Sequence, residues 1–253
     1  MTVSLKVLVN YLDELLNASA IQDYCPNGLQ VEGHNEVKKI IGGVTATQAL
    51  IDLAISKKAD AILVHHGFFW KGESQVITGI KKNRIQALLQ NNISLIAYHL
   101  PLDVHPIVGN NAQLAQALNL EITGPLDPSS KLSVGVAAKL KKPMTSNEFK
   151  VFISESLGRD CLHIGDESKI LQSIGLCTGA AQGMISQAVD LGLDAYISGE
   201  ISEPTVHIAN ETGVNYFSAG HHATERGGII ALGSHLKQEF QIDFEFIDLY
   251  NPV

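Results

Sequence analysis

The sequence predicts an α/β fold made of two related halves that share a central metal-binding cleft. Apolar strand-like segments alternate with amphipathic helical segments along the chain. One strand–helix–strand pattern occurs twice, which suggests an internal duplication. Histidines and carboxylates recur where these strands end, and open α/β sheets place their active sites at such strand ends.

Composition narrows the class of protein. The chain has 253 residues, 45% of them hydrophobic, and a net charge of −8 without a basic block. This charge gives no strong signal for nucleic-acid binding. Three widely spaced cysteines predict neither a disulfide framework nor a zinc finger. The first residues predict an amphipathic helix rather than a signal peptide or membrane span, so we expect a cytoplasmic protein.

The repeated pattern begins near residue 40 and again near residue 173. Ile41-Gly42 matches Ile174-Gly175 at an offset of 133, and Asp60-Ala61 matches Asp194-Ala195 at 134, which implies one inserted residue in the helix. Each copy has an apolar strand, a threonine at a turn, an amphipathic helix and a second strand. The alternative is that any two strand–helix–strand units look alike.

A third strand follows each copy, and a histidine and a carboxylate with the same spacing follow each of these strands. NNISLIAYHLPLD parallels TGVNYFSAGHHATE at an offset of 122, which pairs His99 with His221 and Asp103 with Glu225. The shared spacing of histidine and carboxylate favours duplication over chance.

The segment from about 124 to 169 differs from both copies. Gly124-Pro125 predicts a turn, LSVGVAAKL alternates like a strand, and Thr145 with Glu148 forms a capping box for a helix that should end at Gly158. A short strand is expected around 161–164. We therefore expect one half at 1–125, with 223–253 packing on it, and the other at 126–222.

The tandem histidines His65 and His66 are the most informative motif. They close the apolar run DAILV, and Gly67 lets the backbone turn after them. Adjacent strand residues point to opposite faces, so the two rings are better placed for two neighbouring ions than for one. The alternative is that they are hydrogen-bonded core residues, although two buried rings both need partners.

Two further segments supply candidate metal ligands. Asp103 follows the strand that carries His99, and a carboxylate can bridge two cations; alone it could equally be a cap or turn residue. His221 and Glu225 lie four residues apart and face the same way if a helix begins there. An acidic residue near a helix start is also common without a metal.

Other candidates are weaker. Glu200 lies opposite His66 in the duplication and is a candidate outer-shell orienter or general base, or a surface glutamate. Asn110 and Asn111 are interpreted as helix caps. Cys25 lies in a tight turn and has no assignable histidine partner, so we do not expect it to be catalytic.

Four motifs in order carry a family resemblance: CPNGLQVEG, HHGFFWKG, YHLPLDVHPIVGNNAQLA and AGHHATERGG. Together they resemble the NGG-one-interacting-factor-three-like family, whose bacterial members are labelled type 2 GTP cyclohydrolase I homologues. The resemblance covers essentially the whole chain. It implies a NIF-three-like fold, a toroidal homohexamer and a di-metal centre of zinc, iron or manganese facing an internal cavity. The implied ligands are those that the spacing selected: His65, His66, Asp103, His221 and Glu225.

The favoured function is therefore metal-dependent hydrolysis of a nucleotide or related heterocycle. Two ions activate a water, which attacks C8 of a guanine ring in the cyclohydrolase case, and His99 or Glu200 relays protons. One alternative is a non-catalytic hexameric module that binds metal or docks a partner. Another is a metal-dependent phosphoesterase.

Overall fold

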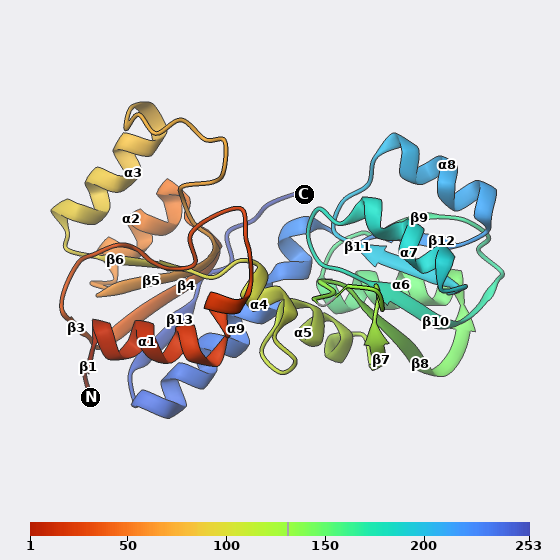
Figure 1. Cartoon of the computed structure of the whole chain (residues 1–253), viewed down its shortest axis with the longest axis horizontal. Coiled ribbons are helices and arrows are strands. Elements are labelled where there is room, and N and C mark those ends of the chain that lie inside the picture. The colour runs from red at the N-terminus through yellow and green to blue at the C-terminus, as the bar shows by residue number, and fades with distance from the viewer. Residues whose placement is uncertain (131) are drawn as a thin grey trace. The chain divides into compact units, whose positions relative to one another are not determined.

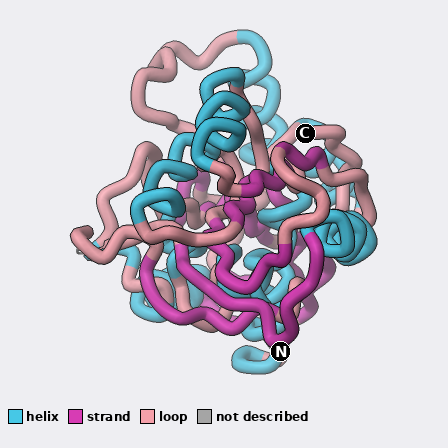
Figure 2. Tube along the Cα trace, turned by 90° about the vertical axis from the view of Figure 1, so that its right-hand side faces the viewer, coloured by secondary structure: helices cyan, strands magenta, loops and turns pink. Residues whose placement is uncertain are grey.

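The computed structural model describes residues 1–130 and 132–253 and confirms a mixed α/β fold. Strands alternate with helices along the chain, as the secondary-structure colours in Figure 2 show. The chain divides into a first unit, Met1–Leu102 with Gly228–Tyr250, and a second unit, Asp103–Gly227 with Asn251–Val253. Within the described residues, no helix is both long enough and apolar enough to span a membrane.

The first unit is built on a five-stranded sheet with the order β13-β4-β5-β6-β2. Its strands are β2 (Gly28–Val31), β4 (Lys39–Thr45), β5 (Ala61–His66), β6 (Ser94–Ala97) and β13 (Asp243–Phe246). The four strands from β13 to β6 are parallel, and β2 closes the edge antiparallel to β6. A two-stranded ribbon of β1 (Val3–Ser4) and β3 (Glu36–Val37) adjoins α1 in sequence.

Helices cover both faces of this sheet (Figure 1). Helices α2 (Gln48–Ser56) and α3 (Gly79–Gln90) lie on one face, where Leu50 and Leu88 pack in a core with Ile62 and Val64 of β5. Helix α1 (Leu5–Leu15) lies on the other face. It is amphipathic, as the sequence predicts, and buries Leu5, Leu8 and Leu12.

The second unit contains a six-stranded mixed sheet with the order β7-β8-β10-β11-β12-β9. Its strands are β7 (Leu120–Pro125), β8 (Val136–Thr145), β9 (Leu162–Ile164), β10 (Ile170–Leu176), β11 (Ala195–Ser198) and β12 (Asn215–Ser218). The neighbouring pairs β10–β11 and β11–β12 are parallel, and the pairs β7–β8, β8–β10 and β12–β9 are antiparallel. The turn-rich junction predicted from Gly124-Pro125 through 127–130 begins later than expected. Gly124 and Pro125 end β7, where an edge strand tolerates proline because its outer amides need no partner, and the turn lies at 127–130.

Alternate residues of the central strands divide between two cores. Ala195 and Ile197 of β11 pack with Phe149 of α6, whereas Tyr196 packs with Ile185 of α7. This period of two is the pattern expected of a strand covered on both faces. The helices of this unit are α4 (Leu100–Val104), which begins in the first unit, α5 (Asn110–Ala117), α6 (Ser146–Leu157), α7 (Ile185–Asp190) and α8 (Glu203–Thr212).

The boundaries of α6 follow the predicted caps. Thr145 and Glu148 form the reciprocal capping box of α6, and Gly158 ends that helix in the left-handed conformation at φ 69°. Two short 3₁₀ turns, Ala18–Ala20 and Gln182–Met184, complete the connections. Helix α9 (His221–Phe240) begins in the second unit, and its residues from Gly228 onward belong to the first.

The two halves share matching contacts. Asp60 Oδ2 accepts the amides of Lys38 and Lys39 at 2.8 and 2.9 Å. The carboxylate of Asp194 accepts the amides at 172 and 173, at 3.0 and 2.9 Å, so the same contact recurs exactly 134 residues later. We propose that this match reflects the duplication suggested by the sequence.

Sheet register corrects the alignment of the two copies. Ala61 pairs with Ile40 in the first unit, and Ala195 pairs with Ile174 in the second. An offset of 134 therefore holds from the first strand onward, and the offset of 133 with one inserted residue is wrong. The error arose because both strands contain an Ile-Gly pair, which lies one position apart in the two registers.

Candidate functional site

Three histidines gather at the carboxyl ends of β5 and β6 in the first unit. Their candidate ligand atoms, one from each of His65, His66 and His99, lie within 4.8 Å of one another. The rings of His65 and His66 are only 4.6 Å apart between centroids, so the expected separation to opposite faces of the strand is wrong. Both residues belong to β5, and His66, its last residue, still pairs with Thr45 of β4.

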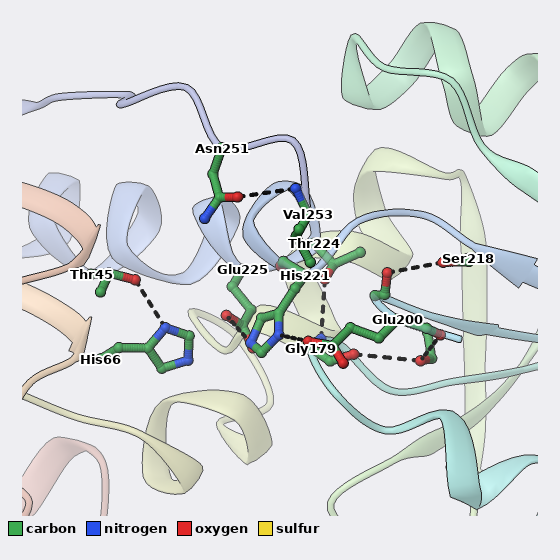
Figure 3. A network of polar contacts seen from close by, with 12 residues as sticks. Thr45, His66, Gly179, Glu200, Ser218, His221, Thr224, Glu225, Asn251 and Val253 are labelled. Carbon is green, nitrogen blue, oxygen red and sulfur yellow. Dashed lines mark hydrogen bonds and ion pairs between the residues drawn. The ribbon is translucent and has the colours of Figure 1, made fainter. Parts of the chain in front are cut away.

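Hydrogen bonds fix the orientation of these imidazoles. His65 is fully buried, and its Nδ1 donates to the carbonyl of Tyr98 at 2.9 Å, which leaves Nε2 as the nitrogen able to bind a metal. Nδ1 of His66 lies 3.0 Å from Thr45 Oγ1 (Figure 3). Gly67 is required for a steric reason, because a Cβ there would lie 2.1 Å from Oε1 of Gln30.

Asp23 holds His99 in place. Its Oδ1 lies 2.7 Å from His99 Nδ1, and its Oδ2 accepts the amide of Leu100 at 2.9 Å and the side-chain amide of Asn27. Burial raises the pKa of Asp23, but the hydrogen bonds from His99 and Asn27 outweigh it and lower the pKa to about 2. Asp23 was missed in the sequence because its segment looks like an ordinary turn.

Cys25 lies beside this pair. Its sulfur and candidate ligand atoms of Asp23 and His99 lie within 4.8 Å of one another, so a histidine partner does exist. Burial and the Asp23 charge nevertheless raise the pKa of Cys25 to about 12. The thiol is therefore protonated near neutral pH, which makes it a poor nucleophile.

The second unit contains a carboxylate-rich group at the start of α9 (Figure 3). Nδ1 of His221 lies 2.7 Å from Glu200 Oε1, and its Nε2 lies 3.2 Å from Glu225 Oε2, one helical turn away. Burial lowers the pKa of His221, but the bonds and charges of Glu225 and Glu200 outweigh burial and raise the pKa to about 9. The imidazole is therefore protonated at neutral pH, and metal binding there would release a proton.

Asp103 belongs to the same group. One of its carboxylate oxygens lies within 4.8 Å of one of Glu225, and both residues are buried. Oδ1 of Asp103 accepts Asn110 Nδ2 at 2.8 Å and Thr178 Oγ1 at 3.3 Å. Two buried carboxylates this close repel each other when both are ionised, and a cation would relieve that repulsion.

Asn110 and Asn111 are not helix caps. Both side chains are buried; Asn110 binds the Asp103 carboxylate, and Asn111 donates to the Asp103 carbonyl at 3.2 Å. Asn111 Oδ1 also accepts the amide of Thr178 at 3.0 Å. The cap assignment failed because an asparagine at a helix start is a common cap, and its long-range partners are not visible in a local pattern.

Gly179 makes room for Glu225. A Cβ at this position would lie 2.2 Å from Glu225 Oε1, and the backbone has a φ of +68°. The Gly179 amide donates to Thr224 Oγ1 at 3.1 Å (Figure 3). Gly179 therefore leaves the space that the Glu225 carboxylate occupies.

The sequence-predicted residues thus form one group in each unit. His65, His66 and His99 meet in the first unit, and Asp103, Glu200, His221 and Glu225 meet in the second. Imidazole nitrogens combined with carboxylate oxygens suit zinc, iron or manganese better than magnesium or calcium. The donor set therefore fits the kind of metal that the sequence implies.

Comparison with known proteins gives one consistent result. A family model described as Duf34/NIF3 (NGG1p interacting factor 3) matches residues 3–252. A Pseudomonas aeruginosa protein named "GTP cyclohydrolase 1 type 2 homolog" is 51% identical over 252 residues, which is 100% of each chain.

Two solved structures agree over the whole chain. The protein titled "Structural genomics, protein ybgI, unknown function" has a TM-score of 0.95 at 47% identity, covering 99% of this chain and 100% of that one. The Thermus thermophilus protein TTHA1606 has a TM-score of 0.89 at 31% identity, with the same coverage. The NIF-three-like fold expected from the four sequence motifs is confirmed.

Proposed function

This chain belongs to the Duf34/NIF3 family, and from that premise we propose that it is a metal-dependent hydrolase acting on a nucleotide or related heterocycle. The observation that carries the proposal is the pair of preorganised donor groups. One unit gathers three imidazoles, and the other gathers an imidazole with two buried carboxylates. Such groups are costly to bury together unless they serve a ligand.

The proposed ligands for two divalent ions are His65, His66, Asp103, His221 and Glu225. Asp103 lies in α4, and His221 and Glu225 lie in α9. His99 and Asp103 are four residues apart, a stretch that spans at most about 14 Å even when extended. Divalent ions bound there supply Lewis acidity and make water a better nucleophile near pH 7.

Glu200 and His99 have proposed roles around these ligands. Glu200 engages Nδ1 of His221 and thereby directs Nε2 toward a metal, the usual task of a carboxylate behind a histidine ligand. His99 is held through Nδ1 by Asp23, so its Nε2 is the nitrogen available to exchange a proton with substrate. We assign His99 to general acid–base catalysis and Glu200 to positioning.

Assembly into a homohexamer is proposed from the family resemblance. Exposed apolar side chains in the first unit support an association surface: Ile80 and Val76, four residues apart, are 69% and 65% exposed. Light scattering coupled to size-exclusion chromatography measures the mass directly, and a monomer of 27.2 kDa would contradict the proposal.

The test combines metal analysis with a substrate panel. The purified protein is analysed for zinc, iron and manganese and then incubated with GTP, other nucleotides and model phosphoesters. The double variant His65→Ala, Glu225→Ala should lose bound metal and turnover together. The matched control is His34→Ala with Glu211→Ala, since both of these residues are exposed and outside the proposed ligands.

The product identifies the reaction class. Formate release supports the cyclohydrolase, and phosphate release supports a phosphoesterase. Full turnover by a metal-free double variant would contradict metal-dependent hydrolysis. Retained metal with no turnover across the panel would instead favour a non-catalytic module that binds metal or docks a partner.

A further inference from the structure

Two aromatic side chains flank the histidine group of the first unit. The ring of Trp70 lies 4.9 Å from that of His99 at 86° and 5.9 Å from that of His66. The ring of Tyr24 lies 6.3 Å from His99 at 61°. Trp70 follows β5 in the loop before α3, and Tyr24 lies in the segment before β2, so two separate loops bring aromatic rings to the same imidazole.

These two loops are tied together. The amide of Lys71 donates to the carbonyl of Tyr24 at 2.6 Å, and Asp23 fixes the adjacent turn through its bonds to His99 and Leu100. The amide of Trp70 is held by Glu73 Oε2 at 3.2 Å. Trp70 and Tyr24 therefore lie on a backbone framework that is anchored on both sides.

The backbone is strained immediately before Trp70. Phe69 has a φ of +66°, a conformation that a bulky side chain rarely adopts. Both Phe68 and Phe69 pack against the core of the first unit, and Lys81 Nζ lies 5.0 Å above the Phe69 ring. An extended chain would send consecutive side chains to opposite faces, so the left-handed residue is what allows two neighbouring phenylalanines to pack inward.

Strain of this kind often accompanies a functional placement. Here it places Trp70 beside His66 and His99. Tyr24 is 62% exposed and Trp70 is partly exposed, whereas Tyr98, Tyr196 and Tyr216 are completely buried. Aromatic faces left accessible next to a group of imidazoles offer a stacking surface for a flat ring.

We propose that Tyr24 and Trp70 form an aromatic wall that stacks a planar heterocycle of purine type beside the histidines. The inference rests on the proposed function and deepens it, because it names the ring system and the residues that select it. An exposed aromatic face recognises a flat π-system of any such ring, and the polar imidazoles beside it then orient the ring edge. Ribose and phosphate alone have no planar π-system that could stack on these rings.

The chain provides its own reporter for this contact. Trp70 is the only tryptophan, so tryptophan fluorescence comes from the wall alone. Guanosine and GTP are titrated into the metal-loaded protein, with ribose 5-phosphate as the non-planar comparison. We expect guanosine and GTP to quench the emission below about 1 mM, the upper end of ordinary KM values, and ribose 5-phosphate to leave it unchanged.

Variants separate stacking from general structure. Trp70→Ala and Tyr24→Ala should each weaken guanosine binding by about 5- to 100-fold, because loss of one aromatic ring that stacks on a base typically weakens binding by about this factor. Equilibrium dialysis measures the affinity. Trp70→Phe keeps a flat ring and should bind within a few-fold of wild type. Tyr250→Ala, which removes another highly exposed tyrosine, is the matched control and should have no effect.

The binding measurements on these variants decide whether the aromatic wall exists. Wild-type guanosine affinity in folded Trp70→Ala and Tyr24→Ala, or no guanosine or GTP binding at about 1 mM, overturns the wall. Tyr24→Ala remains informative if Trp70→Ala does not fold. Metal analysis is run on every sample. Quenching by guanosine in protein that holds no metal supports the aromatic wall and contradicts the proposed hydrolase. Metal-dependent GTP turnover that is unaffected by Trp70→Ala supports the hydrolase and contradicts the wall.

Discussion

In each unit a carboxylate contacts the Nδ1 atom of a histidine, but the two carboxylates come from different parts of the fold. Asp23 and Glu200 both lie 2.7 Å from an Nδ1 atom, of His99 and His221 respectively. Asp23 comes from the segment before β2 and its side chain is 2% exposed, whereas Glu200 follows β11 and is 32% exposed. At the offset of 134, Glu200 occupies the position that His66 has in the first unit.

This difference shows how one scaffold position can be used for two purposes. The first unit uses the end of its middle strand for a nitrogen donor and takes its orienting carboxylate from elsewhere. The second unit uses the same strand end for the orienting carboxylate and places its donors in α9 and α4. We infer that the first group is specialised for imidazole ligands and proton exchange, and the second for carboxylate ligands.

The largest effect expected from this comparison is at Gly179. Gly179→Ala places a Cβ where it would lie 2.2 Å from Glu225 Oε1, and the carboxylate at the end of a side chain moves more easily than the backbone. Metal affinity should fall about 100-fold, as it does when support for a ligand is lost, while the protein stays folded. Competition with a chelator measures the affinity.

Gly183→Ala is the matched control. A Cβ at Gly183 has no neighbour within 4 Å, so this variant should bind metal like wild type. Equal affinity in the two alanine variants would contradict a ligand role for Glu225.

The next effect compares metal affinity after substitution of the two carboxylates that contact histidines, Glu200 and Asp23. Glu200→Gln removes the charge behind His221 and should lower metal affinity by about 10- to 100-fold. Asp23→Asn acts on His99, which is not a proposed ligand, and should leave the bound metal unchanged. Isothermal titration with the same metal compares both variants; equal losses would show that the two pairs have the same task.

Asp23 also predicts a pH dependence of stability. Its pKa in the folded protein is about 2, below the ordinary value of 3.8, so the folded state favours the ionised carboxylate. This contributes about 2 kcal/mol above pH 4, a contribution that is lost as the pH falls toward 2. Urea unfolding of wild type and Asp23→Asn should therefore differ by about 2 kcal/mol at pH 7 and converge in acid; a constant difference would contradict the role of charge.

The smallest expected effect is on the stability contributed by the residues that follow α2 and α7, which occupy matching positions in the two units. Lys58 follows α2 at a φ of +54°, and Gly192 follows α7 at +64°, again 134 residues later. Only glycine takes this conformation without strain, so Lys58→Gly should stabilise the protein by about 0.5–1 kcal/mol and Gly192→Lys should destabilise it similarly. Thermal unfolding measures both, and a change of the same sign in the two variants would argue against the match.

Sequence patterns predicted the parts of this protein that local chemistry determines. The apolar strands, the capping box at Thr145 and the glycine end of α6 depend on residues close in sequence, and the structure confirms them. The tandem histidines were visible because polar residues interrupt an apolar strand at its end. Their ring contact was not visible, since a sequence pattern does not show how two neighbouring side chains are rotated.

Long-range partners account for what the sequence left out. Asp23 reaches His99 across 76 residues, and Thr178 reaches Asp103 across 75. Asn111 also looked like a cap because its partner at Thr178 is brought near only by the sheet. The alignment error at Ile41 has the same origin, because strand register depends on pairing between strands and not on the letters of one strand.

The carboxylates at 60 and 194 have a consequence for how the polypeptide reaches its native state. Asp60 accepts amides at the start of β4, and Asp194 accepts amides within β10, so each carboxylate bonds to the preceding parallel strand across at most 22 residues. Short-range closures of this kind form early and limit slippage of neighbouring strands. Each half therefore contains its own short-range contact that fixes the position of one strand against the next.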